Sequence, residues 1–487
     1  MEPTRIIQRP ALREQRSGRL GTVAGIGLAL SMLPGPALAQ PSRRLCPVQL
    51  GGTLEAIAAQ SLGEQARWGA LVQPVLEGAP ALYARSPQQY FTPASNVKLL
   101  TSAAALAALG PDFRIVTSVH VSDDALGEGR PEAGAAADGV DLWVAGRGDP
   151  SFDDDDLQQL ARQVRRSGIS RVRHLIGDER YLGDRFVNPT WDWEDVQSGY
   201  GAPVNSLILN QNAIGVRLFP QAVGQPLRLE WEQPALADRW QVINESTTVA
   251  ASAPEFVRVG REWSAPVLRV QGQLRVGSAR DRSAVAVTDP ATHFLEQFEL
   301  ALVAAGVAVD ETVAQASAGT FSLDQQSGPK SPEEVARTVS PPLSELLIAT
   351  NADSQNLYAE ALLRHLGRAA SPDVRGAAAL WNAGLVQVET TLSALGITGA
   401  YQLADGSGLS RRNLVTPEAL VQTLQAMAQH PHAAAYQASL AVAGERGTLR
   451  SRFRDTPVAG RFWGKSGGLT GVSSLSGYLE PPGYAPL

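Results

Sequence analysis

Residues 96–109 constrain the fold most, because their sequence, NVKLLTSAAALAAL, is apolar on nearly every side of a helix. Pro93 stands just before this stretch and Gly110-Pro111 follows it, as is typical of helix boundaries. A helix without a polar face lies inside a domain. Its first turn nevertheless contains Lys98, so the chain buries an amine. Burial disfavours the charged amine and lowers its pKa toward neutral pH.

Lysine is rare in this chain. The 42 basic residues include only three lysines, Lys98, Lys330 and Lys465, and the rest are arginines. Arginine keeps its proton near neutral pH, whereas a desolvated lysine can release it. A retained lysine is therefore a candidate for proton transfer, although compositional drift could also leave three at random. Lys330 lies in a Gly-Pro linker and serves as an internal control.

Ser95 lies three residues before Lys98. Residues i and i+3 share one face of a helix, so the amine can reach the hydroxyl. A serine hydroxyl is a poor nucleophile until a base takes its proton. The pair predicts a nucleophile and its base, but a Ser-x-x-Lys sequence alone arises about once or twice by chance in a chain this long.

Two further motifs are ambiguous when taken singly. Ser354-Gln355-Asn356 lies between two predicted helices, where serine and asparagine also serve as helix caps. Lys465-Ser466-Gly467-Gly468 lies on a predicted strand. Its cation and hydroxyl could hold a substrate carboxylate, and its glycines would let a substrate backbone approach closely. The alternative is an ordinary strand end.

Together, and in this order, the three motifs match the signature set of serine β-lactamases and penicillin-binding proteins. Ser95 and Ser354 are 259 residues apart, so the domain that holds both is split by a long insertion that ordinary β-lactamases lack. The layout resembles the D-alanyl-D-alanine carboxypeptidase/endopeptidase family, the low-molecular-mass class C penicillin-binding proteins. Further segments support this resemblance: GDPS at 148–151, WED at 193–195, YGAP at 200–203, NQN at 210–212, AE at 359–360 and DGSGLSR at 405–411.

The resemblance implies a role for each matching residue. Ser95 corresponds to the acylated nucleophile and Lys98 to its base. Ser354 and Asn356 correspond to the pair that shuttles a proton and holds the substrate. The terminal carboxylate would be bound by Lys465 and Ser466, and the oxyanion by the backbone N–H groups of Ser95 and Gly468. Gly467 and Gly468 would both be substrate-binding residues. The side chains that would grip the free end of a diaminopimelate residue are Asp195, Tyr200 and Arg411. The family implies no metal and no cofactor.

The chain departs from the family in two places. Ser466 stands where threonine is usual, which keeps the hydroxyl. The family continues with a further strand and a helix beyond the position of Leu487, so we expect an uncovered sheet edge near the end of this chain.

The implied fold is α/β (α+β): a penicillin-binding-protein/β-lactamase-like transpeptidase domain, in which helices flank an antiparallel sheet, with two smaller inserted domains. We assign 40–112 and 336–487 to the DD-peptidase domain, 113–205 and 291–335 to inserted domain two, and 206–290 to a small β-rich domain three. We predict helices at 291–307, 341–350, 357–366, 373–395 and 417–429, and strands at 113–121, 140–145, 171–176, 462–468 and 473–479.

Residues 1–39 have the pattern of a cleaved secretory signal: an arginine-rich start, an apolar run at 20–33 and Ala37-Leu38-Ala39. The run is too short for a membrane anchor, and we expect no later transmembrane segment. We therefore predict a periplasmic protein. A net charge of −6 without a basic block argues against nucleic acid as a partner, and Cys46, the single cysteine, rules out an internal disulfide.

Two other clusters have ordinary explanations. The aspartates of 153–156 are followed by LQQLARQVRR, which predicts the start of a solvated helix rather than a calcium loop. His430-Pro431-His432 has no carboxylate-bearing metal motif around it and is predicted to be a surface loop.

The sequence thus predicts a serine-type D-Ala-D-Ala carboxypeptidase, with DD-endopeptidase activity as an extension. Its expected substrates are peptidoglycan stem peptides, and β-lactam antibiotics would acylate Ser95. Two alternatives remain open: a serine β-lactamase, which would turn penicillin over, and a catalytically inactive wall-binding scaffold.

Overall fold

The computed structural model describes residues 47–61, 66–76, 78–121, 139–183, 187–262, 265–313 and 333–487. The predicted signal at 1–39, Cys46 and Lys330 lie outside these ranges. Within them, no helix is both long and apolar enough to span a membrane.

In the described part of the chain, helices and strands follow one another in groups, such as the run of strands over residues 213–286 and the run of helices over residues 343–394. The helices are α1 (Pro47–Ser61), α2 (Val97–Leu109), α3 (Asp154–Arg166), α4 (Pro290–Ala304), α5 (Leu343–Asn351), α6 (Asn356–Ala370), α7 (Ala377–Ala394), α8 (Pro417–Gln429) and α9 (Ala433–Ala438). The strands are β1 (Ala70–Val72), β2 (Tyr83–Arg85), β3 (Val116–Val121), β4 (Val140–Ala145), β5 (Arg171–Asp178), β6 (Ala213–Phe219), β7 (Arg228–Trp231), β8 (Gln241–Val249), β9 (Phe256–Arg261), β10 (Val267–Arg275), β11 (Asp281–Ala286), β12 (Ala308–Val313), β13 (Glu333–Val339), β14 (Tyr401–Gln402), β15 (Leu414–Val415), β16 (Ala441–Val442), β17 (Phe462–Leu469) and β18 (Val472–Leu479).

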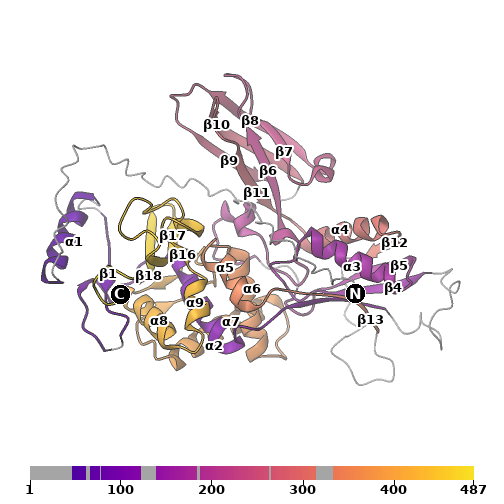
Figure 1. The fold of residues 1–487 in the computed structure, drawn as a ribbon. Coiled ribbons are helices and arrows are strands. Elements are labelled where there is room, and N and C mark those ends of the chain that lie inside the picture. Colours follow the sequence, from indigo (N-terminus) through magenta and orange to yellow (C-terminus); the bar gives the residue numbers. More distant parts are fainter. Residues whose placement is uncertain are drawn as a thin grey trace, which may run out of the picture.

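Helix α2 is the centre of the first hydrophobic core. All residues from Val97 to Leu106 are buried, as the sequence predicted, and α5 to α9 pack around them (Figure 1). On its other side, the short 3-10 helix η1 (Ala94–Asn96) packs against the antiparallel sheet β16-β17-β18. Helices flanking an antiparallel sheet confirm the predicted fold class.

A second core lies between a mixed five-stranded sheet and helices α3 and α4. The strand order is β12-β5-β4-β3-β13, with β4, β5 and β12 parallel and the other two pairs antiparallel. Helix α3 begins as expected: the Asp153 side chain accepts from the backbone N–H groups of Asp155 and Asp156, and Asp156 accepts from the Asp153 N–H. The aspartate run is thus a capping box.

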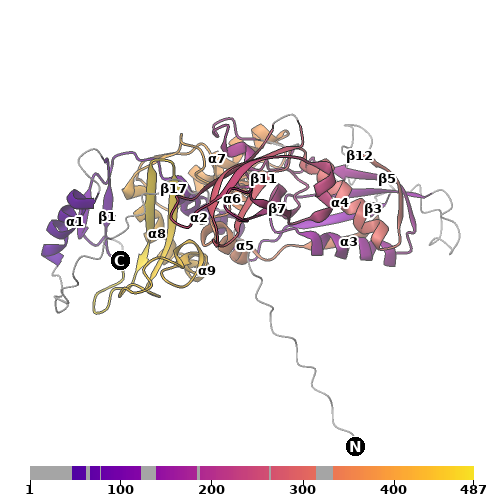
Figure 2. The same ribbon diagram turned by 90° about the horizontal axis from the view of Figure 1, so that it is seen from above.

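A third core lies between two three-stranded sheets, β11-β6-β7 and β8-β10-β9, which form a β-rich module that projects from the rest (Figure 1). Figure 2 shows that β17 and α8 lie toward one end of the molecule and β12 toward the other. These three cores of the described residues support the division into three domains, which we keep as a proposal.

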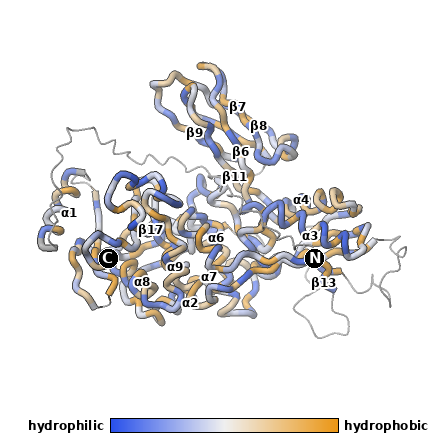
Figure 3. Tube along the Cα trace, in the orientation of Figure 1, coloured by the Kyte–Doolittle hydropathy of each residue, from blue (hydrophilic) through white to orange (hydrophobic). Residues whose placement is uncertain are grey.

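Some element boundaries differ from the sequence prediction. Helix α7 begins at Ala377 rather than at 373, because Gly376 has φ 84°, which a helix does not accommodate. Strand β3 begins at Val116 rather than at 113, because Phe113 and Ile115 instead pair with the segment before α5. Figure 3 shows the contrast between the hydrophobic trace of α2 and the hydrophilic trace of α3.

The end of the chain turns back onto β18. Leu479 and Leu487 exchange both backbone hydrogen bonds, at 2.8 and 2.9 Å, and the Val75 N–H donates to the Pro486 carbonyl. The chain therefore covers the end of β18 itself, although Leu475, nearer the middle of the strand, stays 39% exposed.

Candidate catalytic site

Ser95 and Lys98 are brought together by the junction of η1 and α2. The Lys98 amine donates to Ser95 Oγ at 3.1 Å, to Asn356 Oδ1 at 2.6 Å and to the Ser407 carbonyl at 2.7 Å. Three acceptors use all three protons of an ammonium group. The junction is tight, because a Cβ on Gly408 would lie 1.9 Å from the Ala94 carbonyl oxygen.

The surroundings of Lys98 shift its pKa into the range in which an amine can accept a proton near neutral pH. The side chain is fully buried, and burial lowers its pKa to about 7, while the charges of Asp405 and Glu360 oppose this shift. A group that is neutral in part of the population near pH 7 can take a proton from a hydroxyl and return it. Lys98 therefore has both the position and the pKa of a general base for Ser95.

A second serine–lysine pair forms the facing wall. Ser354 lies between α5 and α6 with φ 63°, an unusual conformation for a residue other than glycine. The Lys465 amine, on β17, donates to Ser354 Oγ at 2.7 Å and to the Ser466 carbonyl at 2.8 Å. Burial and the nearby Lys98 charge lower the pKa of Lys465 well below its usual value, and Asp353 opposes them.

Asn356 links the two serine–lysine pairs to the residues predicted to bind diaminopimelate, Asp195, Tyr200 and Arg411, which we call the side pocket. Its Oδ1 accepts from Lys98, and its Nδ2 donates to the Tyr200 carbonyl at 3.0 Å. The Tyr200 hydroxyl donates to Asp195 Oδ1 at 2.9 Å, and burial raises the pKa of Asp195. Residues from three separate segments thus form one continuous polar surface.

Arg411 does not pair with Asp195. Its Nε donates to Asp192 at 3.1 Å, and its guanidinium also reaches the Thr470 carbonyl at 3.1 Å. It still lowers the pKa of Asp195 by its charge. The sequence argument overlooked Asp192, which was not part of any motif.

Strand β17 offers an open edge beside the two serines. It pairs with β18 along its whole length but with β16 only at Trp463 and Gly464. Gly467 packs so closely that a Cβ would lie 3.0 Å from the Ser95 nitrogen, whereas a Cβ on Gly468 would meet nothing within 4 Å. This edge has room for an extended peptide beside Ser95.

The hydroxyl of Ser466, on the same strand, donates to Thr448 Oγ1 at 2.8 Å. Thr448 was absent from the sequence argument. Its hydroxyl holds Ser466 in place at one end of the open edge.

The sequence argument also missed the buried carboxylates that shape the Lys98 pocket. Glu360 Oε1 accepts the N–H groups of Gly406 and Ser407, both at 2.9 Å, and burial raises the pKa of Glu360 to about 7. Asp405 accepts the N–H groups of Gly408 and Ser410. The signal was present as Glu360 on the predicted helix 357–366 and as the DGSG run, but neither indicated contact with a lysine.

The site combines a serine hydroxyl with a buried amine whose pKa is near neutrality, and a second serine–lysine pair lies across an open strand edge. Such a site defines a serine hydrolase that works by acyl transfer. The comparisons give the family. The chain matches the D-Ala-D-Ala carboxypeptidase 3 (S13) family over residues 50–484 and belongs to it.

Similar proteins support this family, and a solved structure supports the fold. The chain is 33% identical to a D-alanyl-D-alanine carboxypeptidase of Actinomadura sp. (strain R39), over 97% of this chain and 87% of that protein. It is 30% identical to penicillin-sensitive carboxypeptidase A of Dictyostelium discoideum, over 83% and 77%. The crystal structure of penicillin binding protein 4 from Haemophilus influenzae has the same fold, with a TM-score of 0.69 and 22% identity over 87% of this chain and 89% of that one.

Proposed function

We propose that this protein is a serine-type D-Ala-D-Ala carboxypeptidase that acts on peptidoglycan stem peptides through an acyl-enzyme on Ser95. The observation that carries the proposal is the Lys98 amine, 3.1 Å from Ser95 Oγ and with a pKa of about 7. Family membership supports the substrate class, and the geometry supports the assignment of the residues.

In the acylation step, neutral Lys98 takes the Ser95 proton as Oγ attacks the carbonyl carbon of the penultimate D-alanine. The carbonyl oxygen becomes negative. The backbone N–H groups of Ser95 and Gly468 stabilise it, because they are fixed dipoles that need no reorganisation. The close contact of Gly467 with Ser95 supports this assignment, since it brings β17 beside the nucleophile.

Collapse of this intermediate breaks the peptide bond. The leaving nitrogen takes a proton from the Ser354 hydroxyl, which the Lys465 amine contacts at 2.7 Å, and D-alanine departs. The proton that Lys98 took from Ser95 then passes to Ser354, so that Lys98 is neutral again. Lys465 and Ser466 hold the terminal carboxylate through this step. Water then attacks the ester while neutral Lys98 takes a proton from the water. Lys98 passes this proton to Ser95 Oγ as the ester bond breaks, so Ser95 regains its hydroxyl and the shortened peptide leaves with a carboxylate.

β-Lactams would enter the same route by offering a strained amide to Ser95, and their bulky remainder would hinder the attacking water. A solved structure of the H. influenzae protein contains a β-lactam, and the Dictyostelium relative is named penicillin-sensitive. The pattern of residues 1–39 supports export to the periplasm, where the substrate is found.

The test is digestion of purified muropeptides by the wild type and by Ser95→Ala, together with labelling by a fluorescent penicillin. We expect the wild type to release D-alanine from pentapeptides and to retain the label, and Ser95→Ala to do neither. Rapid turnover of penicillin would indicate a β-lactamase instead. A wild type that neither labels nor cleaves would be a binding scaffold. Cleavage of cross-linked dimers would add endopeptidase activity.

A further inference from the structure

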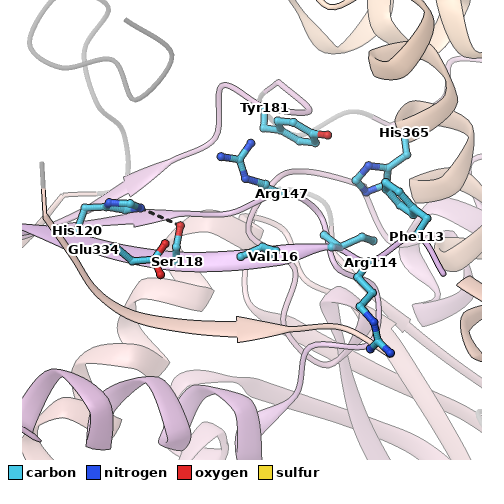
Figure 4. Close-up of a pocket in the computed structure, with 10 residues that line it drawn as sticks. Phe113, Arg114, Val116, Ser118, His120, Arg147, Tyr181, Glu334 and His365 are labelled. Atoms are coloured by element: carbon cyan, nitrogen blue, oxygen red, sulfur yellow. Dashed lines mark hydrogen bonds between the residues drawn. The ribbon is translucent and has the colours of Figure 1, made fainter. Parts of the chain in front are cut away.

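A cavity of about 410 Å³ lies where the segment between α2 and β3 meets helix α6 (Figure 4). Its lining combines aromatic rings with charged and polar side chains. They are Phe113, Arg114, Ile115, Val116, Ser118, His120, Arg147, Tyr181, Glu334 and His365. None of them belongs to the catalytic motifs. His365 follows Asn356 by nine residues on α6, about 14 Å along the helix axis, so the cavity is separate from the catalytic residues.

His365 is a buried polar group without a fixed partner. It is 3% exposed, with its ring edge-on to Phe113 at 5.4 Å and tilted against Tyr181 at 5.7 Å. The Gly148 backbone lies close enough to favour the protonated ring. Among the described residues, however, no group meets either ring nitrogen at hydrogen-bond distance and angle. Burial lowers the pKa of His365 to about 4, so near neutral pH the ring offers one N–H donor and one acceptor.

Arg147 supplies a cation on the same side. Its guanidinium lies 5.0 Å from the centre of the Tyr181 ring and makes no hydrogen bond or ion pair with any residue that the structure describes. Figure 4 shows it between Tyr181 and the strand that carries Val116 and Ser118. Arg114 differs from Arg147, because its guanidinium points away from the other lining residues and donates to the Ser340 carbonyl at 2.8 Å.

The opposite end of the cavity is acidic. Glu334 lies beside Ser118 and His120 in Figure 4, and His120 and Ser118 are joined by a 2.8 Å hydrogen bond. The outer contact of Glu334 is with Arg337, 3.6 Å away, and the two side chains are 38% and 55% exposed. An exposed ion pair of this kind is weak, so the carboxylate can accept another partner.

We propose that this cavity binds a small zwitterion, an amino acid or a dipeptide. The ligand carboxylate would pair with Arg147 and accept the N–H of His365, and the ligand ammonium would pair with Glu334. Tyr181 and Phe113 would cover its apolar part. A carboxylate suits the arginine because a guanidinium binds it through two parallel hydrogen bonds. The proposal is independent of the catalytic function.

The test is titration of the full chain with alanine, with acetate as the carboxylate alone and with methylamine as the amine alone. Binding is measured by calorimetry, and the ring-nitrogen NMR signals of His365 localise it, since the catalytic residues could also bind a carboxylate. We expect alanine to bind and to shift these signals, and acetate to do so more weakly. Methylamine should leave them unchanged.

Three variants sharpen the test. Arg147→Gln should weaken alanine binding at the cavity tenfold or more, whereas Arg162→Gln, at an exposed arginine of α3, should bind as the wild type does. Glu334→Gln should weaken alanine binding but not acetate binding. If Arg147→Gln melts below the wild type, Arg147→Lys keeps the charge and should retain binding. The proposal would be overturned if no ligand shifts the NMR signals of His365, or if Arg147→Gln binds alanine as the wild type does.

Discussion

Lys98 and Lys465 are both fully buried, and burial lowers the pKa of each, yet their surroundings differ. Lys98 lies on a helix near the buried carboxylates Glu360 and Asp405, which hold its pKa near 7. Lys465 lies on a strand, with Asp353 as its opposing charge and with Lys98 repelling it. Burial explains why both pKa values fall, and the neighbouring charges distinguish the two amines, because two carboxylates oppose the fall at Lys98 whereas the Lys98 charge adds to it at Lys465. The comparison assigns proton transfer from Ser95 to Lys98 rather than to Lys465.

The largest expected effect is that of Lys98→Arg. Guanidinium cannot release its proton near neutral pH, so acylation by penicillin and release of D-alanine should both fall by roughly 10³-fold or more. The second-order rate constant for acylation measures this. Lys330→Arg makes the same chemical change at the remaining lysine and should behave as the wild type. An active Lys98→Arg enzyme would show that the base is another group.

Lys465→Arg should have a smaller effect, because we assign this residue mainly to the substrate carboxylate, for which arginine keeps the charge. We expect about a tenfold rise in KM for a D-Ala-D-Ala substrate, with measurable acylation retained. Steady-state kinetics beside the Lys98 variant provide the comparison. Equal loss in both variants would mean that the two amines act as one unit.

The pH dependence of acylation tests the pKa of Lys98 directly. The base is neutral above its pKa, so the acylation rate constant should rise about tenfold per pH unit below pH 7 and level off above it, with its midpoint near pH 7. Stopped-flow acylation between pH 5 and 9 measures this.

Glu360→Gln is the matched variant for the pH profile. One oxygen of Glu360 accepts both the Gly406 and the Ser407 N–H groups, and glutamine can keep these bonds while it removes the charge. Because the Glu360 charge raises the Lys98 pKa, the midpoint should move to lower pH. A midpoint that moves up or does not move would contradict the assignment.

The smallest expected effect concerns the side pocket. We propose that Asp195 binds the ammonium group of a diaminopimelate side chain, so Asp195→Ala should slow cleavage of diaminopimelate stems about fivefold, as expected for one partly exposed ion pair. Small synthetic D-Ala-D-Ala substrates should be affected less. Tyr200→Phe removes the hydroxyl that donates to Asp195 and is the matched control for a loss of order among the side-pocket residues. Equal slowing on all substrates would exclude this role.

Much of the site could be predicted from the sequence because its residues lie in short motifs. The spacing of Ser95 and Lys98 predicted that the amine reaches the hydroxyl, and the burial of Lys98 followed from the apolar sequence around it. The fold class followed from the order of the three motifs and the length between them. The contact of Arg411 with Asp192 and the role of the Ser407 carbonyl were not readable, because each joins segments that are far apart in the chain.

The sequence by itself determined which helix is buried, which serine has an amine one turn away and where the family motifs stand. These properties depend on neighbours within a few residues, for which helix periodicity is a sufficient guide. Only the tertiary structure decided the pKa of each lysine. That value depends on charges contributed by α6, by the loop that begins at Asp405 and by the segment before Ser354, and no local pattern states how close these segments come in space.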